Sequence, residues 1–202
     1  MHPRSGTDSE VIQAVLQGDI ERYAELVDRY QRAALKLAFG FLGNYEDAKD
    51  VAQEAFVSAY SALGHFQHQA KFSTWLYRIV INKCKDFCKR RCRTPLVVAS
   101  VGTADPELDG VASLFVDVAD PSADPRDQLS NRELGKHLTR AIEALPTNQR
   151  AAFVLHHLQG IPVEEVAGVM GCRVGTVKSH LFRATAHLRI QLAPWLAHEQ
   201  EG

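Results

Sequence analysis

Residues 160–189 read GIPVEEVAGVMGCRVGTVKSHLFRATAHLR, and this stretch decides the fold of the C-terminal part of the chain. It divides into a short helix that begins at Pro162 or Val163 and ends at Met170, a turn over residues 171–173, and a longer helix from Val174. Pro162 suits a first helical position, because the N–H that it lacks would have no helical partner there. The pattern therefore predicts a helix-turn-helix.

The longer helix of this motif has one apolar and one polar face. The apolar face repeats at helical spacing and is predicted to be buried: Val177, Leu181, Ala184 and Leu188. The other face carries hydroxyls and basic or titratable groups, which can read base edges by hydrogen bonds and phosphates by charge: Thr176, Ser179, His180, Arg183 and His187. An ordinary helical hairpin with a solvated polar face is the alternative.

The N-terminal part of the chain is also predicted to be helical. Helical periodicity runs through residues 9–39 with a break at Gly18, then through residues 45–63 and residues 71–93. It stops at residue 94 and returns from residue 131. About four helices are therefore expected before the irregular segment, and about four after it.

Charge divides the chain, whose formal net charge is −1, into three parts. Residues 1–94 hold 14 basic against 11 acidic residues, residues 95–127 hold 1 against 7, and residues 128–202 hold 8 against 6. Prolines punctuate the acidic middle part, which indicates a flexible linker, although its short apolar patches could form a strand or a docking motif. We therefore expect an all-α protein: two small helical domains, residues 1–94 and 128–202, joined by an acidic linker, the second domain containing the helix-turn-helix.

The cysteines and the overall hydropathy indicate a cytoplasmic protein. No segment has the roughly 18 to 20 consecutive apolar residues that span a bilayer, and the opening residues MHPRSGTDSE lack the apolar core of a signal peptide. Cys84, Cys88, Cys92 and Cys172 are expected to remain thiols. The first three follow one helical stripe, where they either pack or sense a metal or an oxidant. Ligands four residues apart on a straight helix seldom complete a tetrahedral site, so no metal site is predicted.

A basic helix end follows an aromatic segment. Residues 83–93 read KCKDFCKRRCR, with six basic residues against one acidic residue, and follow FSTWLYR (residues 72–78) after four further residues. Cations supply phosphate affinity and aromatic rings can stack on unpaired bases, so this combination suits single-stranded or melting DNA. Trp75 and Tyr77 could equally be core-edge residues, and a basic helix end also complements the helix dipole.

Three motifs in order resemble the bacterial sigma factors of the extracytoplasmic-function (ECF) group, the smallest members of the sigma-70 family. They are DAKDVAQEAFVSAY (residues 47–60), HFQHQAKFSTWLYRIVINKCKDFCKRR (residues 65–91) and ALPTNQRAAFVLHHLQGIPVEEVAGVMGCRVGTVKSHLFRA (residues 144–184). The resemblance implies a factor that binds core RNA polymerase, directs it to promoters and assists promoter melting. It implies no catalytic residue, no cofactor and no small-molecule substrate.

The resemblance also assigns residues to partners. The DxxQE positions of the family, which contact polymerase, correspond to Asp50, Gln53 and Glu54, although a merely solvated polar edge is the alternative. The residues matching the part that captures flipped minus-ten bases and holds the melted strand are Phe66, Lys71, Trp75, Arg78, Asn82, Lys85, Lys89, Arg90 and Arg91. The residues expected to contact the minus-thirty-five element are Arg173, Thr176, Lys178, Ser179, His180 and Arg183.

In this family the linker threads toward the polymerase active-site cleft and the RNA exit path, and residues 95–127 have the acidic charge for that role, or are only a solvating spacer. The resemblance further implies an anti-sigma factor as a partner, expected to be membrane-associated. A DNA-binding regulator without polymerase affinity is disfavoured by the DxxQE helix and by FSTWLYR. An enzyme is disfavoured because the sequence has no phosphate-binding glycine loop, nucleophile elbow or spaced metal-ligand set.

The sequence departs from the family at His180, where members often carry arginine. A neutral histidine offers one donor and one acceptor and lacks the bidentate guanine contact of arginine. We therefore predict that His180→Arg changes the preferred minus-thirty-five sequence. Selection from a randomised promoter library measures this change, and identical preferences of the two proteins would contradict it.

Overall fold

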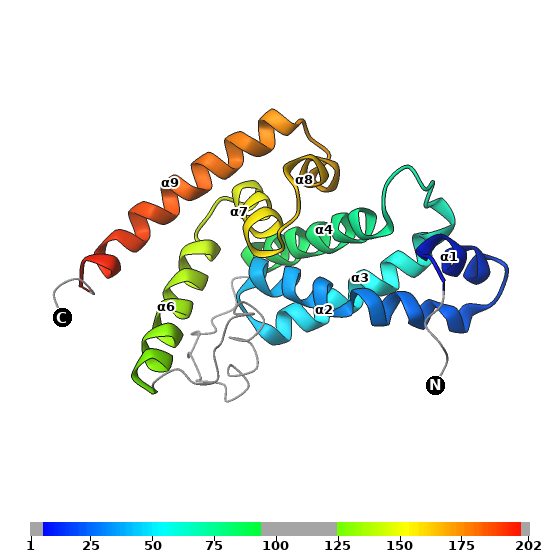
Figure 1. The fold of residues 1–202 in the computed structure, drawn as a ribbon, viewed down its shortest axis with the longest axis horizontal. Coiled ribbons are helices and arrows are strands. Elements are labelled where there is room, and N and C mark those ends of the chain that lie inside the picture. Colours follow the sequence, from blue (N-terminus) through cyan, green and yellow to red (C-terminus); the bar gives the residue numbers. More distant parts are fainter. Residues whose placement is uncertain (1–5, 94–124, 199–202) are drawn as a thin grey trace.

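The computed structural model describes residues 6–93 and 125–198, and every regular element in these ranges is helical (Figure 1). The predicted all-α class is therefore confirmed. Residues 94–124, which include most of the acidic linker predicted over residues 95–127, lie outside the described residues. The C-terminal helices lie along one side of the N-terminal ones, and α9 extends away from them (Figure 1).

The first two helices form a helical hairpin. Helix α1 (Asp8–Leu16) begins with a capping box, in which the Thr7 hydroxyl accepts from the Glu10 N–H and the Glu10 carboxylate accepts from the Thr7 N–H. Gly18, with a φ of +109°, reverses the chain, and a 3₁₀ turn then leads into α2 (Tyr23–Leu42). The break predicted at Gly18 is therefore confirmed.

The next two helices complete the N-terminal half. Gly43 ends α2 in the left-handed conformation, and the Asn44 side chain accepts from the Asp47 N–H at 2.9 Å to begin α3 (Tyr45–Ala62). After a 3₁₀ turn and a loop, α4 (Phe72–Arg93) follows. Helices α2, α3 and α4 pack against one another around a core of aliphatic and aromatic side chains.

The C-terminal half consists of α6 (Pro125–Glu143), α7 (Thr147–Phe153) with a π-helical turn (Val154–Leu158), α8 (Val163–Met170) and α9 (Val174–His198). Breaks at Pro146, at residues 160–162 and at Gly171 separate these helices, and the last is the turn predicted over residues 171–173. The pattern placed the first start at residue 131, whereas α6 begins at Pro125, since proline is accepted at a first helical position. Residues 125–127, which the sequence assigned to the linker, are therefore helical.

The two halves share one continuous hydrophobic core, and Arg150 of α7 connects them at its edge. The Arg150 guanidinium donates to the carbonyl oxygens of Phe41 (3.1 Å), Leu145 (3.2 Å) and Glu143. It also lies 5.2 Å from the centroid of the Phe41 ring, within the range of a cation–π contact. The ends of α2 and α6 are thus joined to α7 through one side chain.

Gly43 lies at this junction and has a φ of +73°. A Cβ atom there would lie 1.7 Å from the Glu143 Oε1 atom and 3.0 Å from the Thr139 side chain. Gly43→Ala should therefore lower the free energy of unfolding by about 1–2 kcal/mol from the left-handed backbone alone. Urea denaturation measures this change.

Gly135→Ala in α6 is the matched control, since nothing lies within 4 Å of its Cβ position and its backbone is helical. This change should raise the free energy of unfolding by about 0.5–1 kcal/mol. Equal effects of the two substitutions would contradict the assignment of Gly43.

Candidate nucleic-acid interface

A row of polar and basic side chains runs along α4 and the residue before it. Lys71 precedes the helix with 72% of its side chain exposed, and Arg78 and Asn82 follow one turn apart on the exposed surface. Lys85 is half-buried, and the row ends in exposed cations: Lys89, Arg90 and Arg91. These predicted minus-ten residues therefore lie along the length of one helix, with Lys71 just before its start.

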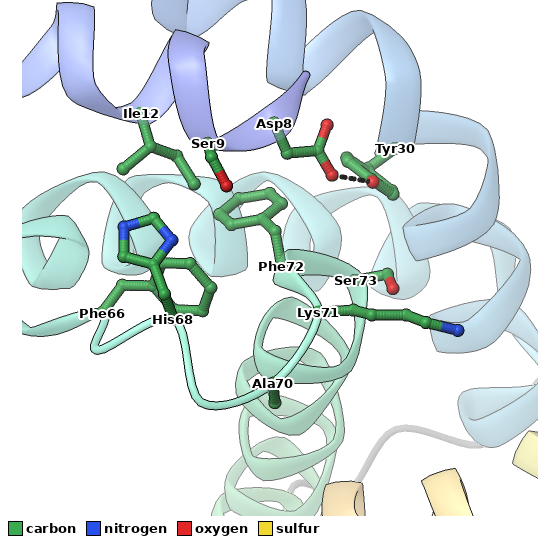
Figure 2. A pocket seen from close by; sticks show the side chains of 10 residues that line it. All are labelled: Asp8, Ser9, Ile12, Tyr30, Phe66, His68, Ala70, Lys71, Phe72 and Ser73. Atoms are coloured by element: carbon green, nitrogen blue, oxygen red, sulfur yellow. Dashed lines mark hydrogen bonds between the residues drawn. The ribbon is translucent and has the colours of Figure 1, made fainter.

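A cavity of about 240 Å³ lies beside the start of α4 (Figure 2). The loop before the helix contributes Phe66 and His68, and α1 contributes Asp8, Ser9 and Ile12. The Asp8 carboxylate at its rim accepts from the Tyr30 hydroxyl at 2.5 Å and from Arg29 at 2.9 Å. The cavity therefore combines an aromatic wall with polar groups from a helix that the sequence did not connect with this loop.

Phe66 itself is only 9% exposed, because it packs in an aromatic cluster. Its ring centroid lies 5.3 Å from that of Trp75, 5.9 Å from that of Phe72 and 4.7 Å from that of His68. Trp75 is half-buried in the same cluster. Of these two predicted minus-ten residues, Phe66 lines the cavity and Trp75 packs behind it in the aromatic cluster, and neither ring is freely exposed.

Three cations of the same row contact the C-terminal half. The Lys71 Nζ atom lies 2.6 Å from the Glu165 carboxylate, and Lys85 donates to the Asn148 side chain at 3.0 Å. The Arg78 Nε atom donates to the Val169 carbonyl at 3.3 Å, and its Nη2 atom donates to the Gly168 carbonyl. Burial lowers the pKa of Lys85, and the nearby Lys89 lowers it further. Sequence patterns did not predict any of these contacts, since they join residues about 60 to 95 positions apart.

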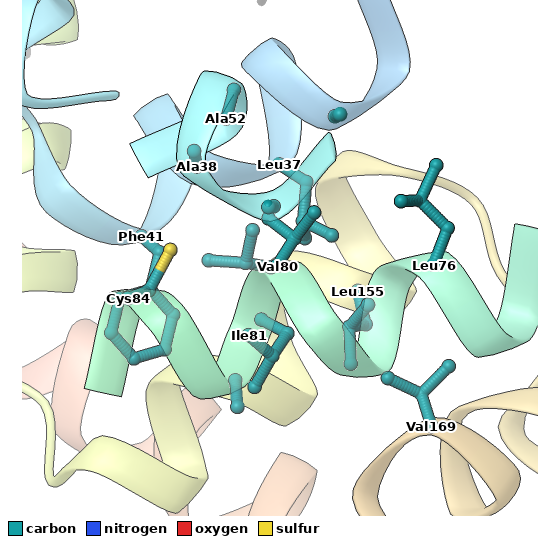
Figure 3. Close-up of a cluster of buried hydrophobic side chains, with 14 of the residues drawn as sticks. Leu37, Ala38, Phe41, Ala52, Leu76, Val80, Ile81, Cys84, Leu155 and Val169 are labelled. Carbon is teal, nitrogen blue, oxygen red and sulfur yellow. The ribbon is translucent and has the colours of Figure 1, made fainter. Parts of the chain in front are cut away.

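Apolar side chains from both halves meet around α4 (Figure 3). Val80 of α4 points toward Ala38 and Ala52, whereas its neighbour Ile81 lies on the side of α4 where Leu155 and Val169 approach. All six of these side chains are at most 7% exposed. Helix α4 is therefore buried on two sides, by the N-terminal helices and by the C-terminal ones.

The far end of α4 pairs with acidic residues of α3. Glu54 lies 3.7 Å from the Lys83 Nζ atom and 3.9 Å from Arg90, and Arg91 lies 3.2 Å from Asp47. Burial raises the pKa of Asp47, and the Arg91 charge opposes that rise. Glu54, a predicted polymerase contact, thus already has cationic neighbours within the chain.

Most of the predicted positions on the polar face of α9 are exposed, and so is Arg173 just before the helix: Thr176, Lys178, Ser179 and Arg183. His180 differs, because it is half-buried and its Nδ1 atom is buried without a hydrogen-bond partner in the described part of the chain. Phe182 is 77% exposed on this helix, next to Arg183. The sequence analysis did not single out Phe182, although its position outside the apolar stripe was a signal.

Two family profiles match this chain, and both describe parts of one family. Sigma-70 region 2 matches residues 26–94, and Sigma-70, region 4 matches residues 136–188. The chain is 38% identical to the RNA polymerase sigma-H factor of Pseudomonas aeruginosa over 94% of its own length and 95% of that protein. It is 34% identical to the ECF RNA polymerase sigma-E factor of Escherichia coli over 93% and 95% of the two lengths. The chain is an ECF sigma factor of the sigma-70 family.

Solved structures support the fold of this sigma factor. CnrH, solved in complex with the cytosolic domain of CnrY, is similar with a TM-score of 0.64 and 24% identity over 93% of this chain and 97% of that chain. The sigma factor RpoE from Bartonella quintana, solved with the anti-sigma factor NepR, gives a TM-score of 0.55 and 21% identity over 87% and 97% of the two chains. Both confirm the helical architecture.

The surface of α3 carries the DxxQE positions of the sigma factor. Asp50, Gln53 and Glu54 are all exposed. Val57 and Tyr60, which follow on the same helix, are exposed to 62% and 39% despite being apolar or aromatic. The exposed surface therefore continues beyond the polar motif. This continuation was not predicted from the sequence, although the helical spacing from Gln53 to Val57 could have shown it.

The cysteines of the sigma factor differ in exposure along α4. Cys84 is fully buried, Cys88 is half-buried and Cys92 is exposed. No group of three or more metal-ligating side chains comes together within residues 6–93 and 125–198. Packing therefore accounts for Cys84, whereas Cys92 lies at the surface.

No helix in residues 6–93 and 125–198 is long and apolar enough to cross a membrane.

Burial raises the pKa of the Cys84 thiol, and burial also raises that of Cys88. A rise of one pKa unit lowers the reactive thiolate fraction about tenfold. At about pH 8, iodoacetamide should therefore alkylate Cys92 at least about tenfold faster than Cys84, as peptide mass spectrometry can measure. In urea the two rates should become similar, and equal rates in the native protein would contradict the prediction.

Proposed function

We propose that this sigma factor binds core RNA polymerase, directs it to promoters and assists in melting them, without catalytic activity of its own. The supporting observation is that one chain presents two different nucleic-acid surfaces. The exposed face of α9 carries hydroxyls and cations that suit the major groove. The row on α4 combines cations with an aromatic-walled cavity, which suits a single strand.

In this proposal, residues 1–94 bind polymerase and the minus-ten element, and residues 128–202 bind the minus-thirty-five element. A base flipped from the minus-ten strand would enter the cavity of Figure 2 beside Phe66, while the cations of α4 hold the strand's phosphates. Stacking and hydrogen bonds in the cavity would offset the few kcal/mol that unstacking one base costs. Residues 95–127 would connect the two domains on the polymerase.

The minus-thirty-five contacts would come from Thr176, Ser179 and Arg183 together with Arg173 and Lys178. Their exposure allows hydroxyl and guanidinium groups to reach base edges and phosphates. Phe182, which is exposed, would add an apolar contact to a thymine methyl group. The buried Nδ1 atom of His180 could reach a base only if the ring turned outward, so any contact in the described orientation would come from its other ring nitrogen.

The polymerase-binding surface would be the exposed stripe of α3 from Asp50 through Gln53 and Glu54, extended by Val57 and Tyr60. Such a mixed stripe supplies both hydrogen bonds and apolar area to a partner helix. The factor would act in the cytoplasm, where polymerase is. An anti-sigma factor would hold it inactive, and the complexes of CnrH with CnrY and of RpoE with NepR support that expectation.

Two sets of substitutions separate polymerase binding from promoter opening. Asp50→Ala with Gln53→Ala should weaken binding to core polymerase about tenfold or more, the effect of losing roughly 1.4 kcal/mol. Asn82→Ala, in the exposed row of α4, should keep that affinity and lower promoter opening by about the same factor. Fluorescence anisotropy measures the first quantity, and run-off transcription with permanganate footprinting measures the second.

Lys49→Ala is the control for the α3 variant, since Lys49 is exposed beside Asp50 on the same helix. It should behave like the wild type in both assays. The proposal fails if the wild-type protein does not direct core polymerase to any promoter, or if both variants match the wild type.

A further inference from the structure

His68 lies in the loop before α4 and has a backbone conformation that residues with a side chain seldom adopt. Its φ is +55°, and no other non-glycine residue in the part of the chain that the structure describes has a positive φ. Strained positions of this kind cluster at ligand-binding and active sites, where the surrounding structure holds them. The conformation of His68 therefore points to a role for its ring.

The imidazole of His68 lies against the Phe66 ring, with the two ring centroids 4.7 Å apart and the ring planes tilted by 60°. Phe72 and Trp75 also contact Phe66, with centroids 5.9 Å and 5.3 Å away. His68 differs from both in exposure, because Phe72 is buried and Trp75 is half-buried, whereas His68 is exposed. His68 is therefore the member of this aromatic cluster that a ligand can reach most easily.

His68 also lines the cavity beside the start of α4, together with groups from α1 (Figure 2). Two charged side chains of the same lining are already paired. The Asp8 carboxylate accepts from the Tyr30 hydroxyl at 2.5 Å, and the Lys71 Nζ atom lies 2.6 Å from the Glu165 carboxylate.

The ring nitrogens of His68, in contrast, have no hydrogen-bond partner within residues 6–93 and 125–198. A neutral imidazole offers one donor and one acceptor. The backbone of the loop thus holds a ring with two available nitrogens at the edge of the cavity, over the aromatic side chain beside which a base would enter.

We propose that His68 is a specificity-determining residue of the minus-ten pocket, whose imidazole stays on Phe66 and hydrogen-bonds with the edge of the flipped base. This inference rests on the proposed minus-ten role of the cavity. Stacking on an aromatic ring accepts any base, because every base has a π face, whereas a hydrogen bond depends on the groups that the base edge presents. His68 would therefore add base preference to the affinity that the aromatic wall supplies.

Two substitutions of His68 separate its nitrogens from its ring and its backbone. His68→Phe keeps a ring against Phe66 but has no nitrogens, and His68→Gly removes the ring but suits the positive φ. Each variant would be combined with core polymerase and selected on promoters randomised over the minus-ten element, and the opened promoters would be sequenced. The wild-type factor should prefer one base at the flipped position.

Both variants should weaken this preference about tenfold, the effect of losing roughly 1.4 kcal/mol, and should keep the preferences at the other positions. Gln69→Ala is the control, since Gln69 is exposed in the same loop and does not line the cavity. It should select the same promoters as the wild type. The inference is overturned if either His68 variant keeps the wild-type preference, since the hydrogen bond would then not be the cause.

An abasic site at the flipped position tests for direct contact. On a promoter that the wild-type factor opens, this change should slow opening by the wild type about tenfold more than opening by His68→Gly, which already lacks the contact. Equal losses in the two proteins would show that His68 acts elsewhere. The urea midpoint of His68→Gly should be no lower than that of the wild type, because glycine adopts this backbone conformation without strain.

These experiments distinguish failure of the inference from failure of the sigma function. If the wild-type factor selects no promoter with core polymerase, the proposed function is wrong and the role of His68 falls with it. If the wild-type factor opens promoters with a base preference that the His68 variants share, only the inference about His68 is wrong.

Discussion

The guanidinium of Arg150 is the interaction on which the arrangement of the two halves depends. It bonds to carbonyls at the ends of α2 and α6, which have no partner within their own helices, and it lies over the Phe41 ring. Because Arg150 belongs to α7, these bonds place the π-helical turn against α2. Helix α8 follows directly, and its position on α4 is a consequence of where α7 is held.

The order and class of the elements could be predicted from the sequence because local chemistry determines them. Gly18, Gly43 and Gly171 have positive φ values, and each ends a helix or reverses the chain where the pattern predicted a break. The start of α6 was placed six residues late, since a proline and a run of polar residues resemble a linker. Periodicity detects a helix by its buried face, and the first turns of α6 offered little of one.

The packing of the halves could not be predicted, because periodicity shows that a face is buried but not what buries it. Val80 and Ile81 are adjacent in α4, and each is buried on a different side. A single apolar stripe, which the sequence suggested, accounts for only one of these sides. The second side is buried by Leu155 and Val169, which come from distant segments of the chain and therefore could not be found from the periodicity of α4.

The candidate site also combines features that are local in the sequence with features that depend on distant neighbours. The sequence located the cations of α4 and the polar face of α9, since charge and spacing are local properties. It did not show that Phe66 packs in an aromatic cluster or that one His180 nitrogen is buried, because both depend on neighbours that fold beside them. Nor did it connect Asp8 with the loop that follows α3, although both line one cavity.

The two-sided burial of α4 also bears on the lifetime of the protein. When the halves separate, Ile81, Leu155 and Val169 lose their cover and become apolar surface in water, which favours aggregation and attack by proteases. The packing of the two halves on α4 therefore also protects the chain from aggregation and proteolysis.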